Sequence, residues 1–275
     1  MNTILVPTDY SEVSANSVNY AAELAHISGA KIILFHAFHP PIVTTEVPVI
    51  IPGQEEMQKD AMLLLEEIQR KLKVKYNNTL KVECVCKYGL AVEEIETYAN
   101  QNKVDLVVLG MQGSGLLTEK LIGSVTTALI SKLTCPVLTI DKTVKFRKIN
   151  NIVLANDFKG IKNKAILEPM KEFQRLFKSQ LHVLKIVPEM KITPEVEEAI
   201  TGIKLEHLLE DVKHDFSCIQ NEDVISGIND YVHKKEMDMV IMIPRKHSFM
   251  HNIFNEPKSK QMAFHAHVPL LTIHE

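Results

Sequence analysis

Glycines in the stretch 105–124 are spaced in a way that could bind an anion. The stretch opens with an apolar, β-branched run that is too short for a free-standing helix and predicts a buried strand. Gly110 and Gly113 then allow a tight loop whose backbone can approach a ligand without a clash at Cβ. Gly123 and Ser124 introduce a helical run. Free amide N–H groups and the positive end of a helix dipole meet at such a loop, so it predicts binding of an anion, most often phosphate.

The loop differs from two common phosphate-binding motifs. The chain contains no G-x4-G-K-[ST] and no Lys in the turn, which excludes a P-loop. Thr118 stands where the dinucleotide fingerprint requires its third glycine. A simpler alternative is that the glycines only turn the chain between strand and helix, but a generic turn does not need a glycine as distant as Gly123.

A carboxylate follows the first predicted strand, residues 3–8. Ligands of parallel α/β sheets bind outside the carboxyl ends of the strands, so we expect Asp9 to face the same crevice as Gly110 and Gly113. The alternative is that Asp9 only helps to cap the helix that begins near Ser11.

Strands and helices alternate through the first half of the chain. The resulting expectation is a parallel sheet covered on both faces by helices. The Pro-rich segment 40–52 is unsuited to a central strand, and could be a lid, a partner contact or a loop lying on its own domain. Strands are predicted at 3–8, 31–37, 80–86, 106–109 and 137–140, and helices at 11–28, 54–75, 90–102 and 125–133.

The second half repeats the pattern of the first. NNIVLANDF matches NTILVPTDY and aligns Asp157 with Asp9, whereas DMVIMI matches DLVVLG and aligns Asp238 with Asp105. The two alignments differ by 15 residues, and the Pro-rich segment is the expected place of the deletion. A repeat of about half the chain indicates a duplicated domain.

The predicted domain boundary lies in the basic linker near Lys142–Lys148. We therefore expect a nucleotide-binding domain over residues 1–146 and a second domain over residues 147–275.

The pattern Gly110-x2-Gly113-x9-Gly123-Ser124 resembles the ATP-binding signature of the universal stress protein family. With the repeat, the resemblance covers nearly all of the chain. It implies an α/β fold of two tandem domains, each a five-stranded parallel sheet in the order 3-2-1-4-5 with helices on both faces. The domains would form a pseudo-twofold pair through their last strands, here 137–140 and 270–273.

The resemblance also implies a binding site for ATP and an accompanying divalent cation, Mg²⁺ or Mn²⁺. Asp9 would point toward the ribose, and the backbone of Ala37 would meet the adenine. The implied contacts are Pro7, Thr8 and Asp9 with the nucleoside, Ala37 with the base, and Gly110, Gly113, Gly123, Ser124 and Val125 with the phosphates.

The second half departs from this signature. Its sequence replaces Gly110 with Ile243 and Gly113 with Lys246. It also replaces Gly123 with Glu256 and Ser124 with Pro257. Pro257 has no amide N–H to offer a phosphate, and Glu256 would repel one at a cost of about 1–4 kcal/mol at contact distance. We therefore expect one nucleotide per chain, in the first half. The adjoining basic residues 245–247 could hold another anion or form a solvated loop.

Composition bounds the remaining possibilities. Hydrophobic residues make up 45% of the chain, and its net charge of −3 gives no reason to expect a nucleic-acid or membrane partner. The four cysteines (Cys84, Cys86, Cys135, Cys218) lack C-x2-C spacing, which favours buried, reduced thiols of a cytoplasmic protein. No export signal or membrane-spanning run is expected. The scattered histidines of the second half favour surface positions over a zinc site.

The predicted function is that of an ATP-binding regulatory protein of the stress response, in which occupancy of one domain biases association with unidentified protein partners. No acid–base pair accompanies the loop, so no catalytic residue is assigned and at most slow ATP hydrolysis is expected. The alternatives are a slow ATPase or nucleotidyl-transfer enzyme, and an interaction module without nucleotide. Whether the tandem chain forms a further homodimer stays open.

Overall fold

The computed structural model describes most of the 275 residues. The described residues are 1–40, 53–111, 122–156, 161, 164–187, 189, 196–244 and 267–274, with only the backbone for 196–201.

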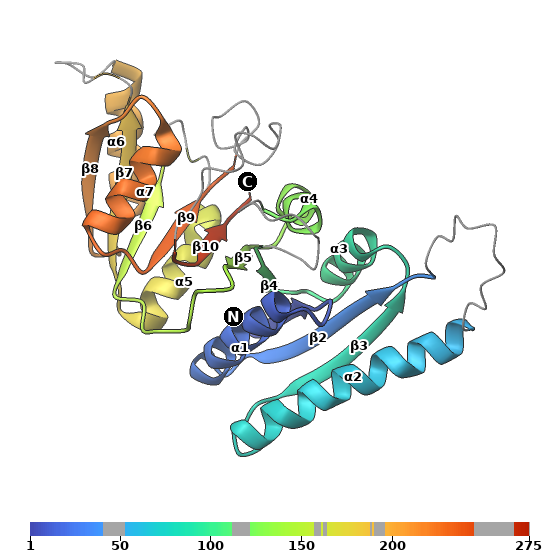
Figure 1. Ribbon diagram of the computed structural model, residues 1–275. Coiled ribbons are helices and arrows are strands. Elements are labelled where there is room, and N and C mark those ends of the chain that lie inside the picture. The colour runs from blue at the N-terminus through green and yellow to red at the C-terminus, as the bar shows by residue number, and fades with distance from the viewer. Residues whose placement is uncertain are drawn as a thin grey trace, which may run out of the picture.

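Helices and strands alternate through both halves of the chain (Figure 1). The first half contains β1 (Thr3–Pro7), α1 (Glu12–Ser28), β2 (Lys31–Phe38), α2 (Gln54–Lys75), β3 (Val82–Tyr88), α3 (Ala91–Gln101), β4 (Leu106–Gly110), α4 (Ser124–Lys132) and β5 (Val137–Ile140). The second contains β6 (Asn151–Ala155), η1 (Lys164–Leu167), α5 (Glu168–Phe177), β7 (Gln180–Val187), α6 (Val196–Leu208), β8 (His214–Gln220), α7 (Val224–Lys234), β9 (Met239–Met242) and β10 (Leu270–Thr272).

All ten described strands form one sheet in the order β3-β2-β1-β4-β5-β10-β9-β6-β7-β8. Neighbouring strands within each half are parallel, and only β5 and β10 pair in the antiparallel direction. The predicted order 3-2-1-4-5 and the meeting of the last strands are confirmed.

The β5–β10 pair, called the seam below, is arranged about a local twofold axis. Leu138 lies opposite Leu271 in the ladder. The hydroxyl of Thr139 donates to the carbonyl of Leu270 at 3.3 Å, and that of Thr272 donates to the carbonyl of Val137 at 3.1 Å. Because the seam is antiparallel, the carboxyl ends of the first-half strands share an edge of the sheet with the amino ends of the second-half strands.

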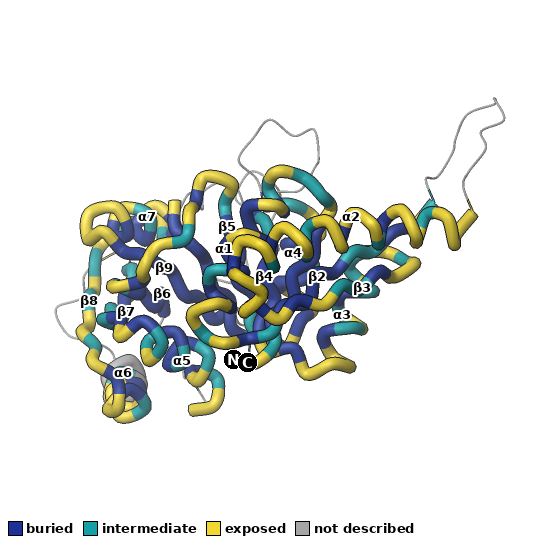
Figure 2. Tube along the Cα trace, turned by 90° about the horizontal axis from the view of Figure 1, so that it is seen from below, coloured by how far each residue is buried: buried dark blue, intermediate teal, exposed yellow. Residues whose placement is uncertain are grey.

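Two apolar layers cover the sheet. One packs β-strand side chains against α1, α2, α5 and α6, and the other packs them against α3, α4 and α7. Figure 2 shows the consequence: the central strands are buried, the edge strands β3 and β8 are partly exposed, and the outer faces of the helices are exposed. Met237, Met239 and Met242 are at most 2% exposed and pack in the core.

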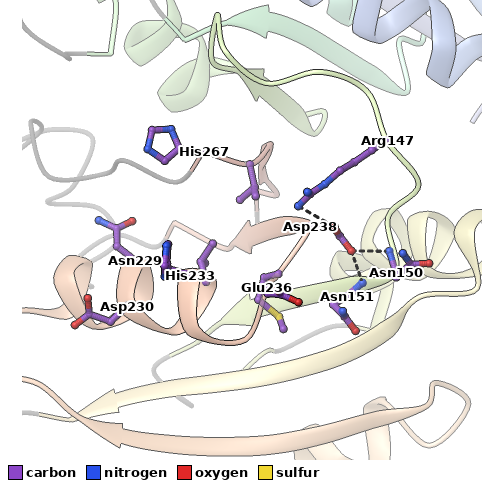
Figure 3. Close-up of a pocket in the computed structure, with 12 residues that line it drawn as sticks. Arg147, Asn150, Asn151, Asn229, Asp230, His233, Glu236, Asp238 and His267 are labelled. Atoms are coloured by element: carbon purple, nitrogen blue, oxygen red, sulfur yellow. Dashed lines mark hydrogen bonds and ion pairs between the residues drawn. The ribbon is translucent and has the colours of Figure 1, made fainter.

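Equivalent aspartates hold the start of the first strand in each half. Asp105 Oδ2 accepts from the backbone N–H groups of Asn2 at 2.6 Å and Thr3 at 2.9 Å. Asp238 Oδ2 accepts from the N–H groups of residues 150 and 151 at 2.8 and 2.9 Å (Figure 3). The alignment of Asp238 with Asp105 thus has a structural counterpart.

Two details differ from expectation. β3 begins and ends two residues later than the predicted strand 80–86. The predicted alternation of side chains between the two faces of the sheet is unaffected. The second half is also shortened within a helix, since α2 has 22 residues and α6 has 13, so the Pro-rich segment alone does not account for the deletion. Residues 41–52 of that segment lie outside the described part.

The linker between β5 and β6 is packed between the halves. The side-chain amide of Asn16 on α1 donates to the carbonyls of Asp141 at 3.0 Å and Val144 at 2.8 Å. The ring of Phe146 contacts Tyr20 on α1 and Phe177 on α5, with centroids 5.0 and 6.2 Å apart.

A lysine of α5 is fully buried. Lys171 is 0% exposed, and its ammonium donates to the carbonyl of Leu208 at 2.9 Å and pairs with Asp211. Leu208 is the last residue of α6, so the ammonium satisfies a carbonyl that the helix leaves without a partner.

Candidate functional site

A cavity of about 130 Å³ lies at the carboxyl edge of the first-half strands. Residues from the ends of β1, β2 and β4 meet there with residues from the starts of α1, α3 and α4. This is the position at which open α/β sheets bind ligands. The lining comprises Pro7, Thr8, Asp9, Ser14, Phe35, His36, Ala37, Ala91, Ile95, Leu109, Gly110, Val125 and Thr126.

Thr8 is a fixed part of this cavity. It is 6% exposed, and its N–H donates to the carbonyl of Phe35 at 2.9 Å. Its hydroxyl lies 3.0 Å from the hydroxyl of Ser14 and accepts from the N–H of Tyr10 at 3.1 Å. The Thr8 side chain is therefore committed to holding the loop between β1 and α1.

Asp9 is exposed at the rim of the cavity. Its Oδ1 accepts from the N–H of Ser11 at 3.1 Å and from the Ser11 hydroxyl at 2.6 Å. Ser11 is the N-cap of α1 and accepts from the N–H of Ser14. Asp9 thus supports the helix start, as the simpler alternative expects, and a carboxylate with about four acceptor positions retains capacity for a ligand.

The amino end of α4 borders the same cavity. Gly123 is its N-cap, with an ordinary φ of −62°, and the Gly123 N–H donates to the carbonyl of Met111 at 2.8 Å. The first backbone bond of the helix runs from Thr127 N–H to the Gly123 carbonyl. The preceding amides, those of Ser124, Val125 and residue 126, have no carbonyl partner within the helix, which is the arrangement that suits an anion.

Thr126 connects the start of α4 to the end of β4 by a hydrogen bond. Its hydroxyl donates to the carbonyl of Gly110 at 2.9 Å, so the end of β4 and the start of α4 are held together across residues 112–121. Those residues lie outside the described part of the chain, and Gly113 is among them.

Six of the nine residues predicted for the site line the cavity: Pro7, Thr8, Asp9, Ala37, Gly110 and Val125. Gly123 and Ser124 lie beside it at the start of α4 without lining it. The sequence did not single out Ser14, His36 or Thr126. A polar residue at the end of an apolar strand, as His36 is, is the signal that could have identified one of them.

The described second-half counterparts differ in what they offer. Asn156 replaces Thr8 and keeps the same backbone bond, donating from its N–H to the carbonyl of Leu184 at 2.9 Å. Ile243 replaces Gly110 and is 4% exposed, with its side chain in the core beneath α5 and α6. The other replacements predicted to disable the site, and the basic residues 245–247, lie outside the described residues.

The thiols of the first half are poorly suited to redox or metal chemistry. Burial raises the pKa of the Cys84 thiol and of the Cys135 thiol to about 11 each, and it also raises the pKa of Cys86. These thiols are therefore protonated near neutral pH. Within the described residues, no group of three or more His, Cys, Asp or Glu side chains is placed to hold a metal ion.

A larger cavity, of about 810 Å³, lies at the amino ends of β6 and β9 (Figure 3). Its lining includes the acids Asp230, Glu236 and Asp238, and Arg147 pairs with Asp238 at 2.9 Å. Among the residues that the structure describes, neither a glycine loop nor a helix amino end lines this cavity. An anion site is therefore better placed in the smaller cavity.

Comparisons with known proteins identify relatives of the first half. The sequence model of the universal stress protein family matches residues 1–141. The universal stress protein MJ0531 of Methanocaldococcus jannaschii is 30% identical over 146 residues, which cover 52% of this chain and 83% of that protein. The universal stress protein YxiE of Bacillus subtilis is 29% identical over 148 residues, covering 50% and 98%.

A solved structure extends the similarity of fold to the whole chain. A universal stress protein from Archaeoglobus fulgidus is 17% identical, and the match covers 100% of this chain and 96% of that one with a TM-score of 0.71. No helix in the part of the chain that the structure describes is long and apolar enough to cross a membrane.

Proposed function

This chain belongs to the universal stress protein family, and from that premise we propose that its first half binds ATP and that the bound nucleotide regulates association with protein partners. The observation that carries the proposal is the cavity in which Asp9, Ala37 and Gly110 meet the amino end of α4. The G-x2-G-x9-G-[ST] pattern of the same stretch supports ATP as the nucleotide.

The chemistry of the lining suits a nucleoside next to phosphates. Apolar side chains of Phe35, Ile95 and Leu109 form one part of the cavity wall, where a base can be shielded from water. Asp9 at the rim offers carboxylate oxygens to ribose hydroxyls. The amides at the start of α4 offer donors and a positive dipole to phosphate oxygens.

A divalent cation would arrive with the phosphates. A magnesium ion that accompanies phosphates is held chiefly by phosphate oxygens and water, so the proposal requires no protein cage for it. Such an ion would reduce the negative charge that the site must accept.

Regulation fits the lining better than rapid catalysis. The described lining holds one carboxylate, Asp9, which is bonded to Ser11, and one imidazole, His36, which is bonded to the Thr8 carbonyl. Neither is a free general base poised beside an attacking water.

The test is an ATP titration of the purified chain by calorimetry with magnesium, followed by measurement of phosphate release. We expect saturable binding with slow or no release of phosphate. Multiple turnovers per minute would favour an enzyme, and lack of binding at millimolar ATP would favour an interaction module. GTP and cAMP in parallel titrations report the specificity for base and phosphate chain.

A further inference from the structure

The rings of His36 and Tyr10 lie together behind the Thr8–Asp9 segment. Their centroids are 4.5 Å apart and their planes are tilted by 36°. Tyr10 packs against the apolar layer beneath α1 and α2. Strand alternation puts His36 on this same face of β2, whereas its neighbour Ala37 packs against the opposite layer.

His36 fixes the backbone at the end of β1. Its Nδ1 lies 2.8 Å from the carbonyl oxygen of Thr8, and since a carbonyl only accepts, Nδ1 carries the hydrogen. The N–H of Thr8 already donates to the carbonyl of Phe35. Both backbone polar groups of Thr8 are thus bonded to adjacent residues of β2, which sets the direction in which Asp9 leaves the strand.

Tyr10 holds the other side of Asp9. Its φ of +62° is in the left-handed region, which a bulky side chain rarely adopts. Its hydroxyl donates to the carbonyl of Ala61 on α2 at 2.8 Å. Residues with such backbone angles persist where their surroundings hold them, and they cluster at ligand sites.

We propose that His36 and Tyr10 are positioning residues for the nucleotide, holding Asp9 at the cavity rim through the backbone at the end of β1. The proposal rests on the nucleotide binding proposed above. When the contacts of His36 and Tyr10 are lost, residue 10 can return to a negative φ and Asp9 turns away from the cavity. The pair also links α2 mechanically to the rim, through the Ala61 carbonyl.

Substitutions at His36 test the role of the Nδ1–H group. The side-chain nitrogen of Asn can occupy the place of Nδ1, whereas that of Gln reaches the place of Nε2. We expect His36→Gln and His36→Leu to weaken ATP binding about 3–10-fold, the effect of one hydrogen bond. We expect His36→Asn to stay within about twofold of wild type, because the donor is kept.

Substitutions at Tyr10 separate strain from positioning. Tyr10→Phe keeps the ring and loses the bond to Ala61, so we expect ATP binding to weaken about threefold. Tyr10→Gly removes the steric cost of the positive φ but also removes the ring. We expect it to fold and to bind ATP about tenfold more weakly, since the support is lost even though the strain is relieved.

A ligand-free measurement keeps this proposal separate from the proposed function. Amide hydrogen exchange at residues 9–11, without nucleotide, should be at least about tenfold faster in His36→Leu and Tyr10→Phe than in wild type. If wild type binds no ATP, the proposed function fails and the exchange still tests the pair. Midpoint temperatures identify any variant that does not fold, and the remaining variant then decides the comparison.

The proposal is overturned if exchange at residues 9–11 is unchanged in the folded variants. It is also overturned if wild type binds ATP while His36→Leu and Tyr10→Gly bind it equally well at a temperature where all are folded. A purely structural role would lower the melting temperature without changing that affinity.

Discussion

The side chain of Asp9 supports the cap of α1 and also lies at the rim of the proposed binding cavity. One oxygen holds the Ser11 cap of α1, and the same carboxylate lies at the rim of the cavity that Gly110 borders. Capping and ligand binding are therefore compatible at this residue, and a substitution affects both. Separating them requires measurements of stability and of affinity on the same variants.

At residue 9 we predict that Asp9→Ala weakens ATP binding by about 10–150-fold for each ribose bond lost, since a charge-assisted hydrogen bond contributes roughly 1.5–3 kcal/mol. Calorimetry measures the affinity, and thermal melting measures the loss at the α1 cap. Asp157→Ala is the matched control in the second half and should leave the affinity unchanged. Equal losses at both positions would refute the assignment of Asp9 to the ribose.

At the scale of elements, the amino end of α4 is the feature on which phosphate binding depends. Gly123 has a φ that any residue adopts, so a residue with a side chain can replace it without straining the backbone. Its N–H bond to Met111 is also independent of the side chain.

We therefore predict that Gly123→Glu, which copies Glu256 of the second half, abolishes measurable ATP binding while the fold is retained. The negative charge costs roughly 1–4 kcal/mol beside a phosphate, and the added side chain occupies the approach. Gly123→Gln is the uncharged control and should bind more tightly than Gly123→Glu. Affinity within threefold of wild type for Gly123→Glu, by calorimetry, would contradict the prediction.

The end of α6 depends on the buried ammonium of Lys171. We predict that Lys171→Met lowers the free energy of unfolding by about 1–3 kcal/mol, because the Leu208 carbonyl loses its donor. Lys171→Ala should lose more, since it also leaves a cavity. Denaturant unfolding of both variants measures the free energy of unfolding. An unchanged value in Lys171→Met would show that the bond to the Leu208 carbonyl contributes nothing.

The partner of Lys171 gives this contact a pH dependence. The hydrogen bond from Lys171 holds the pKa of Asp211 below its usual value. Its contribution is therefore present above the unfolded pKa and is lost as the pH falls through the lower folded value. Asp211→Asn should be less stable than wild type at neutral pH, and the two unfolding free energies should converge in acid.

The order of elements could be predicted because the sequence shows the alternation of strands and helices and the internal repeat. The pairing of β5 with β10 was implied by the resemblance to the universal stress protein family. The registers between strands could not be predicted from the sequence. An alternating pattern also does not mark where a strand begins or ends, which is why the limits of β3 differ from the predicted 80–86. The role of His36 depends on such registers, since the pairing of Pro7 with Phe35 is what brings His36 beside Thr8.

At the scale of the whole molecule, two halves share a strand order but differ where a ligand would bind. Ile243 is buried in the core at the position of Gly110, and Pro257 replaces a residue whose amide could donate. Losing two phosphate hydrogen bonds of about 1.5–3 kcal/mol each weakens binding by roughly two to four orders of magnitude.

We therefore predict one ATP per chain, bound in the first half. Equilibrium titration with a known concentration of active protein gives the stoichiometry, and a crystal soaked with ATP and magnesium gives the position. The Asp9→Ala chain is the control, because any remaining strong site would then lie elsewhere. Two sites of similar affinity would show that the interpretation of the glycines is wrong.

The linker between β5 and β6 determines how the pairing of the two halves depends on protein concentration. Two separate chains that met through such a seam would part as their concentration fell, and their pairing would follow a second-order rate. Here the seam strands belong to one chain, and a short connection gives an effective concentration in the millimolar range. The half proposed to bind nucleotide therefore keeps its partner however few copies of the chain are present.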